Sequence, residues 1–96
     1  MSTIAMRPQA ATAEIQSYCE MLKPKAEAKA ERTFGVYVAK TFITKVWEGT
    51  TYLVKVHVGG EEYVHLNVFK NPFTSPQKLG LLSIQTGKKL NDPLQF

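Results

Sequence analysis

The sequence has little cysteine: Cys19 is the only one in 96 residues. A single cysteine cannot form an internal disulfide, which excludes the disulfide frameworks of small secreted proteins. One cysteine and two histidines are also too few for repeated tetrahedral zinc sites. No apolar run approaches the roughly 18 residues of a membrane span, and residues 1–14 lack the apolar core of a signal peptide. These absences favour one cytoplasmic domain, residues 1–96, with no membrane partner.

Positive charge is in modest excess, with 12 Lys+Arg against 8 Asp+Glu and a net charge of +4. Most of these cations are isolated lysines, and only Lys88 and Lys89 are adjacent. The sequence has no arginine cluster and no aromatic motif of the kind that stacks RNA bases. We therefore expect no nucleic-acid partner and interpret the lysines as solvated surface, open to acidic partners.

The N-terminal third predicts a free arm followed by one helix. Residues 1–10 show no periodicity and are interpreted as a free N-terminal trunk. Thr12 is a good N-cap, and apolar residues then recur every three or four positions, as one face of a helix over 12–31 requires: Ile15, Cys19, Leu22, Ala26 and Ala30. Pro24 lies inside this pattern and predicts a kink, because it cannot donate a backbone hydrogen bond.

The remainder, residues 36–96, predicts an antiparallel sheet. Strand patterns cover 36–46, 50–58 and 62–69, a weaker one covers 79–86, and residues 87–96 show no clear preference. Because no second helical pattern separates the strands, the fold class is α+β. We expect one long N-terminal helix packed across a four- to five-stranded antiparallel sheet.

The turn at residues 59–61 can be predicted from the apolar faces of the strands around it. A two-residue loop at Gly59-Gly60 would set apolar against polar positions, whereas a three-residue loop sets Val56 opposite Val64 and Lys55 opposite His65. The pattern therefore predicts an odd-length loop or a bulge.

Catalytic patterns are missing, so we expect no enzyme, no cofactor and no metal. Cys19 lies on the apolar face of the predicted helix and is interpreted as a packing residue. His57 and His65 are too few for a tight zinc site and are interpreted as solvent-facing. Gly59-Gly60 joins two strands and opens no helix, unlike a phosphate-binding loop. The chain is best interpreted as a binding module.

Two loops carry aromatic residues suited to binding. Lys45-Val46-Trp47-Glu48-Gly49 forms the predicted tip of the first hairpin and holds the only tryptophan, a residue enriched in binding hot spots. Asn71-Pro72-Phe73-Thr74-Ser75-Pro76 places an aromatic residue between two prolines, which lowers the entropy lost on binding. The alternatives are a tryptophan folded back on the sheet and a second loop that serves only as a rigid connector.

Four segments resemble the stefins, the type 1 cystatins. They are AATAEIQ at 10–16, KPKAEAKAERTFGVY at 23–37, GTTYLVKVHVGGEEYVHLNVFK at 49–70 and NDPLQF at 91–96. The resemblance implies a cystatin-like fold and tight, reversible inhibition of papain-like cysteine proteases such as cathepsins. In stefins an N-terminal trunk and two hairpin loops form a wedge that enters the active-site cleft. By position, the protease-binding residues here are Ser2, Thr3, Ile4, Lys45, Val46, Trp47, Glu48, Gly49, Pro72 and Phe73.

All three parts of the wedge depart from the family pattern. The family sequence QVVAG is replaced by KVWEG, which retains only Val46 and Gly49. Thr3 or Ile4 stands where the trunk glycine would fall, and Pro72-Phe73 replaces Leu-Pro. These changes have three explanations: an altered target, weakened or lost inhibition, or engineered loops. The alternative function is a non-inhibitory stefin-fold scaffold that binds proteins through its variant loops.

The resemblance also bears on the oligomeric state. Stefins form domain-swapped dimers by opening the first hairpin loop, and short loops between long strands favour such exchange. We expect a monomer, with a swapped dimer as the alternative.

Overall fold

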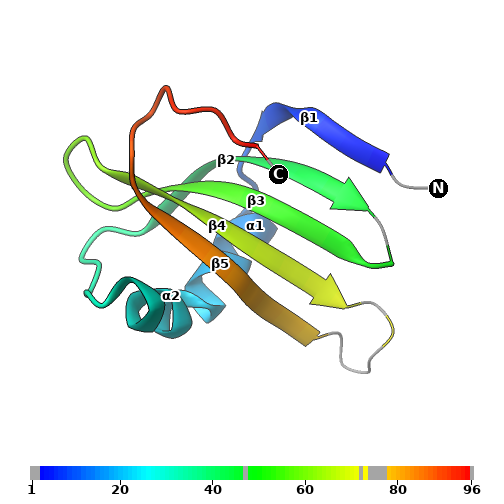
Figure 1. The fold of residues 1–96 in the computed structure, drawn as a ribbon, viewed down its shortest axis with the longest axis horizontal. Coiled ribbons are helices and arrows are strands. Elements are labelled where there is room, and N and C mark those ends of the chain that lie inside the picture. Colours follow the sequence, from blue (N-terminus) through cyan, green and yellow to red (C-terminus); the bar gives the residue numbers. More distant parts are fainter. Residues whose placement is uncertain (1–2, 47, 72, 74–77, 96) are drawn as a thin grey trace.

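The computed structural model describes residues 3–46, 48–71, 73 and 78–95, with residues 3–6 described through their backbone. Five antiparallel strands follow one another across one sheet: β1 (Thr3–Ala10), β2 (Val38–Val46), β3 (Thr50–His57), β4 (Tyr63–Asn71) and β5 (Lys78–Lys88). Two helices, α1 (Ala13–Met21) and α2 (Lys23–Ala30), lie behind this sheet (Figure 1). The predicted α+β, cystatin-like arrangement is confirmed. No helix in the described part of the chain is long and apolar enough to cross a membrane.

The prediction of a free arm at residues 1–10 is wrong. Thr3–Ala10 is a strand that pairs with β2, from Thr3 opposite Val46 to Ala10 opposite Thr41. The register shifts between Ala5 and Gln9, around Pro8, which cannot donate to a sheet ladder. Without β1, the backbone N–H and C=O groups on the outer edge of β2 would lack these hydrogen-bond partners. Backbone pairing does not require alternating apolar side chains, so residues 1–10 show no strand pattern.

The predicted helix over 12–31 is divided into α1 and α2 at Leu22. Thr12 is the N-cap as predicted, since its Oγ1 accepts a hydrogen bond of 3.2 Å from the Ile15 N–H. Pro24 lies in the first turn of α2, where a missing N–H removes no intrahelical bond. The expected kink is therefore a full break, after which α2 continues the same apolar face.

The helices and the sheet enclose the main core between them. Ile15, Cys19, Leu22 and Ala26 from the helical region are buried against alternate apolar residues of β3 and β4, four valines and Leu66. Cys19 and Ala26 are fully buried, so small side chains allow the helices to approach the strands closely. Gln16 fixes the position of α1, because its amide donates to the Tyr37 carbonyl and accepts from the Ala39 N–H.

The turn between β3 and β4 confirms the predicted register. Val56 lies opposite Val64 and Lys55 opposite His65. The Val58 N–H donates to the Glu62 carbonyl at 3.1 Å, which closes a loop of three residues, 59–61. The requirement that the apolar faces of the two strands match therefore predicts the correct loop length.

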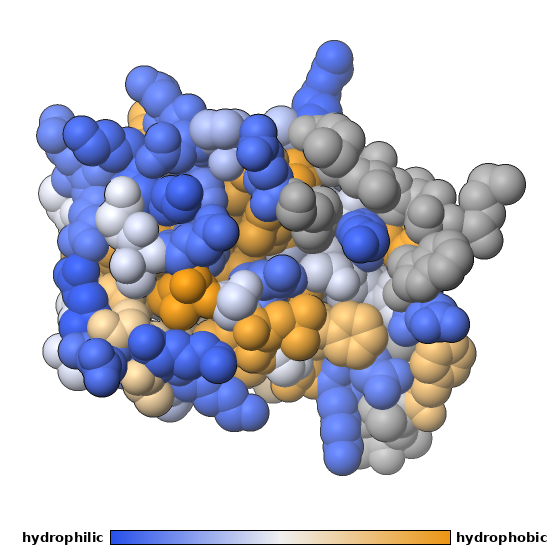
Figure 2. Space-filling view, in the orientation of Figure 1, coloured by the Kyte–Doolittle hydropathy of each residue, from blue (hydrophilic) through white to orange (hydrophobic). Residues whose placement is uncertain are grey.

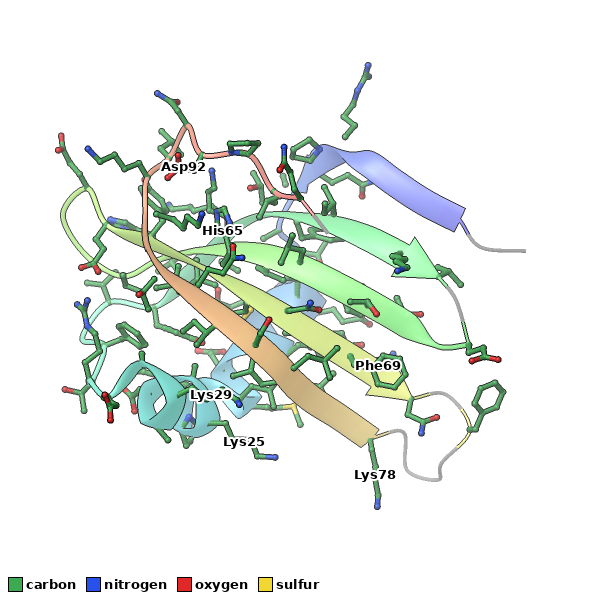
Figure 3. The ribbon with its side chains drawn as sticks, in the orientation of Figure 1. Lys25, Lys29, His65, Phe69, Lys78 and Asp92 are labelled. Atoms are coloured by element: carbon green, nitrogen blue, oxygen red, sulfur yellow. The ribbon has the colours of Figure 1, made fainter. Side chains whose placement is uncertain are left out.

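The prediction that His65 faces solvent is wrong. His65 lies on the face of the sheet away from the helices, but it is buried there. His65 is 2% exposed and Lys55 is 5% exposed, because the segment that follows β5 crosses this face (Figures 1 and 3). Leu94 of that segment packs with Ile43 and Leu53 in a small second core. Elsewhere this outer face is a mosaic of hydrophilic and hydrophobic surface (Figure 2). Alternation reveals which side chains share a face, but not which distant segment covers them.

Candidate functional site

The described residues of the three segments predicted to bind a partner lie at one end of the sheet (Figure 1). Thr3 of β1 pairs with Val46 at the end of β2, and Val46 also pairs with Thr50 at the start of β3. Thr50 in turn pairs with Lys70, near the end of β4. Neighbouring strands lie about 4.8 Å apart, so these four strand ends span about 14 Å. We call this end of the sheet, with the turns that leave it, the loop edge.

The centre of the loop edge is the turn between β2 and β3. Val46 and Glu48 are exposed there, and Lys45 is half-buried. Glu48 has a φ of 49° and Gly49 a φ of 131°, so the chain reverses through two residues with left-handed backbone. Trp47, between them in the sequence, lies outside the described residues, and its predicted role as an anchor stays a prediction.

Phe69 supports this turn, a role that the sequence pattern did not predict. A Cβ atom added at Gly49 would lie 2.7 Å from Phe69 Cζ and 3.1 Å from the Lys70 carbonyl oxygen. The turn therefore needs glycine for both its backbone angle and its contact with the aromatic ring. The predicted register between β3 and β4 could have revealed this contact, because it pairs Phe69 with Thr51, two residues after Gly49. Figure 3 shows Phe69 at this end of the sheet.

The flanks of the loop edge are the trunk and the loop after β4. Thr3 and Ile4 lie opposite Val46 and Lys45 in the ladder, so these two trunk residues adjoin the end of β2, and their role in binding stays a prediction. Phe73 is 80% exposed, and its N–H donates to Asn71 Oδ1 at 2.9 Å. Ser2 and Pro72, the other two predicted residues, lie outside the described part of the chain.

A polar and aromatic contact connects α1 to the sheet behind the loop edge. Lys70 Nζ donates a 2.8 Å hydrogen bond to the Tyr18 hydroxyl, and this bond raises the pKa of Lys70. The Tyr18 and Tyr52 ring centroids lie 5.7 Å apart. Partial burial of Tyr52 raises its pKa, with the Tyr18 hydroxyl adding to the effect. These contacts give the loop edge a rigid support on the helix side.

The residues considered for catalysis do not form a reactive site. Burial, with the charge of Glu20 adding to it, raises the pKa of Cys19 to about 12, so its thiol stays protonated near neutral pH. The predicted packing role of Cys19 is confirmed by its burial. His57 Nε2 lies 2.8 Å from the Gly60 carbonyl oxygen, whereas His65 is buried. Within the described ranges, no three His, Cys, Asp or Glu side chains gather as metal ligands do.

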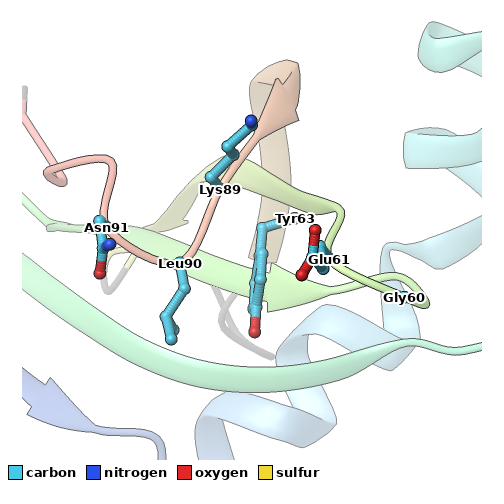
Figure 4. A pocket seen from close by; sticks show the side chains of 6 residues that line it. All are labelled: Gly60, Glu61, Tyr63, Lys89, Leu90 and Asn91. Carbon is cyan, nitrogen blue, oxygen red and sulfur yellow. The ribbon is translucent and has the colours of Figure 1, made fainter.

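A pocket of about 300 Å³ lies at the other end of the sheet, by the turn between β3 and β4 (Figure 4). Its walls come from that turn and from the segment after β5: Gly60, Glu61, Tyr63, Lys89, Leu90 and Asn91. None of the residues predicted to bind a protease lines it, so the pocket is separate from the loop edge.

Comparison with known proteins gives close relatives over nearly the whole chain. Cystatin-B of Paralichthys olivaceus is 44% identical over 90 residues, which cover 94% of this chain and 92% of the relative. Cystatin-B of Oplegnathus fasciatus is 40% identical over 89 residues, covering 93% and 89%. Human cystatin-B is 39% identical over 88 residues, covering 92% and 90%. No family model matches the chain. Identity at this level, together with the fold, shows that the chain belongs to the stefin family, the type 1 cystatins.

Proposed function

We propose that this chain inhibits papain-like cysteine proteases, cathepsins among them, by inserting its loop edge into the active-site cleft. As a stefin, the chain is a cysteine protease inhibitor in general terms and not an enzyme. The binding residues we assign are Ser2, Thr3, Ile4, Lys45, Val46, Trp47, Glu48, Gly49, Pro72 and Phe73. We expect the protein to act as a cytoplasmic monomer, since a swapped dimer would use up the first loop.

The observation that carries this proposal is the convergence of three separate segments on one edge of about four strand ends. Backbone pairing orders the trunk against β2, and the Phe69 ring supports the turn at Gly49. A narrow edge that is already ordered loses little conformational entropy when it enters a groove. The geometry thus supports binding by a preformed wedge.

The altered tips favour a change in the choice of protease. Glu48 is exposed at the turn between β2 and β3 and would bring a carboxylate towards a cleft that holds a cysteine thiolate and a histidinium. Burial of an unpaired charge costs several kcal/mol, so clefts with a cationic partner for Glu48 are favoured. Phe73 adds a large exposed apolar side chain on one flank and suits a cleft with an apolar wall.

The alternative is a stefin-fold scaffold that does not inhibit proteases and binds other proteins through the same edge. The exposed carboxylate of Glu48 is the observation that favours it, because repulsion from the thiolate would weaken entry into every cleft of this class. Both functions use one surface, and protease titration separates them.

The test is a titration of papain and a panel of cathepsins with increasing amounts of the protein. We expect stoichiometric loss of activity for at least one enzyme. Phe73→Ala should weaken that inhibition by about tenfold or more, as truncation of an aromatic anchor does. The matched control is Leu82→Ala, an exposed apolar residue on β5. Full activity of every enzyme at large excess of protein would exclude inhibition, and an equal effect of the two variants would remove Phe73 from the interface.

A further inference from the structure

The segment that follows β5 lies across the outer face of the sheet. We call residues 89–95 the C-terminal strap. A tight turn opens it, in which the Lys89 N–H donates to Asp92 Oδ2 at 2.8 Å and the Asp92 N–H donates to the Lys89 carbonyl at 3.0 Å. Leu94 then packs against Ile43 and Leu53. The strap therefore begins with a turn that is bonded within itself, and Leu94 anchors it to the sheet.

A buried lysine holds the turn of the strap to the sheet. Lys55 Nζ donates to the backbone carbonyls of Leu90 and Asp92, the latter at 2.6 Å. Burial lowers the pKa of Lys55, and the negative charge of Asp92 opposes this shift. Lys55 is a β3 residue, so its ammonium group connects the middle of the sheet to the strap through carbonyl oxygens.

His65 lies directly opposite Lys55 in the ladder between β3 and β4. It is 2% exposed, and its Nε2 has no hydrogen-bond partner among the described residues. Figure 3 places His65 and Asp92 at the same end of the sheet. The charged groups around the imidazole come from every element packed on it: Lys55 from β3, Lys88 from β5 and Asp92 from the strap. Its uncharged neighbours are Gln85, which lies directly opposite it on β5, and Tyr63 and Asn67, which lie two residues before and after it on β4.

Protonation of His65 would place another cation beside Lys55 and Lys88, with Asp92 as the one anion of this group. A buried charge without compensation is relieved most easily by movement of the element with the fewest attachments. Each strand is hydrogen-bonded along its length to a neighbouring strand, whereas the strap begins beside the pocket of Figure 4 and its Leu90 is 59% exposed. Movement of the strap would admit water to His65 without loss of a strand pair.

We propose that the C-terminal strap is released by acid: protonation of His65 detaches residues 89–95 from the outer face while the helices and the sheet stay folded. Burial, with Lys55 and Lys88 adding and Asp92 opposing, lowers the pKa of His65 from 6.5 to about 4. In the released state His65 meets water and regains its ordinary pKa. Acidification from neutral pH to about 4 then shifts the equilibrium towards release by about 100-fold, because at pH 4 His65 is already half protonated with the strap in place.

The test is trimming of the 96-residue chain by a serine carboxypeptidase at pH 7 and pH 4, followed by mass spectrometry. Each rate is divided by that of a free peptide with the sequence of residues 89–96, which corrects for the pH dependence of the enzyme. At pH 7 we expect trimming to stop before buried Leu94. At pH 4 the relative rate past Leu94 should rise by about 100-fold, with an unchanged circular dichroism spectrum.

Two variants separate His65 from the other groups that titrate in this range. His65→Gln keeps a neutral polar side chain and should leave the strap protected at pH 4. His57→Gln is the matched control on β3 and should retain the response of the unmodified chain to pH. Because His65→Gln removes only the imidazole, release at pH 4 in this variant would show that another group triggers it and would overturn the proposal. Protection of the unmodified chain at pH 4, or loss of the sheet in the same step, would overturn it as well.

A measurement on the unmodified chain keeps the proposal testable if His65→Gln does not fold. In a titration followed by nuclear magnetic resonance, the ring signal of His65 and the amide signal of Leu94 should move with one midpoint. Different midpoints for His65 and Leu94 would overturn the proposal. Neither experiment depends on protease inhibition, so failure of the strap-release proposal is distinguishable from failure of the proposed function.

Discussion

At the scale of single residues, the turn of the loop edge depends on Glu48 and Gly49, which both have positive φ angles but differ in how easily they adopt them. Gly49 needs a backbone angle of 131° and close contact with Phe69, which no other residue meets without strain. Glu48 takes a φ of 49°, a conformation that is uncommon for a residue with a long side chain. The backbone thus accepts Glu48 at some cost, and its side chain is left exposed where a partner would bind.

Glu48→Gln tests the role of this carboxylate, because it removes the charge and keeps the shape. If the charge is buried without a partner in the cleft, protease binding should tighten by about tenfold, or ~1.4 kcal/mol. The measurement is the inhibition constant against an enzyme of the panel that is inhibited only weakly, because its cleft is expected to lack a cationic partner for Glu48. Glu61→Gln, an equal change of charge at the far end of the sheet, should leave that constant unaltered. Weaker binding of Glu48→Gln would mean that the carboxylate has a cationic partner in the protease.

At the scale of elements, the helices are held to the sheet by apolar burial, by the hydrogen bond between Lys70 and Tyr18 and by the bidentate amide of Gln16. The apolar face of α1 and α2 packs on β3 and β4, but it does not define where along β2 the helix lies. Gln16 supplies that position, with bonds of 3.0 Å to the Tyr37 carbonyl and 2.7 Å from the Ala39 N–H. Tyr37 and Ala39 are both buried, so water cannot easily replace the amide.

Gln16→Ala should therefore lower the free energy of unfolding by about 2 kcal/mol, since it leaves two buried backbone groups without partners. In a domain of this size the midpoint of thermal unfolding should fall by about 10 °C. Urea or thermal denaturation followed by circular dichroism provides the measurement. Ser17→Ala, at the next and exposed position of α1, should change stability by less than about 0.5 kcal/mol. Equal effects of the two variants would show that the amide bonds contribute nothing specific.

At the scale of the whole molecule, the sheet has two differently covered faces. The helices cover one face with apolar side chains, and the strap covers part of the other through Lys55, His65 and Leu94. Sensitivity to acid belongs to the second face, because His65 there is held neutral by burial. The loop edge lies at one end of the sheet and the pocket beside the strap at the other.

The stability of the fold should fall as the pH falls from about 6.5 to about 4. The pKa of His65 is lower in the folded state than in the unfolded state, so the unfolded chain binds more protons in this range. The loss is at most about 3.5 kcal/mol, from a pKa of 6.5 in the unfolded chain and about 4 in the folded chain at ~1.4 kcal/mol per pKa unit. Urea unfolding at several pH values measures it. His65→Gln should flatten the profile in this range relative to His57→Gln, and identical profiles would contradict the assignment.

Much of the fold and part of the candidate site followed from the sequence by itself. The apolar face of the helices, the N-cap at Thr12 and the three-residue loop at 59–61 all depend on residues close together in the chain or on strands joined by one turn. Convergence of the turn at Glu48-Gly49 with Phe73 follows from the same antiparallel order. Local periodicity and turn length determine these features, because each is specified by short-range geometry.

The tertiary structure alone decided what covers each exposed edge and face. β1 forms because the outer edge of β2 offers unpaired backbone groups, and His65 is buried because a segment beginning 24 residues later in the chain, at Lys89, crosses it. The contact of Gly49 with Phe69 likewise joins positions 20 residues apart. These contacts pair backbone groups or bury side chains between residues far apart in the chain, and no repeating pattern in the sequence indicates which distant residues meet. The sequence thus determined the elements and their register, whereas long-range packing decided which polar side chains left solvent.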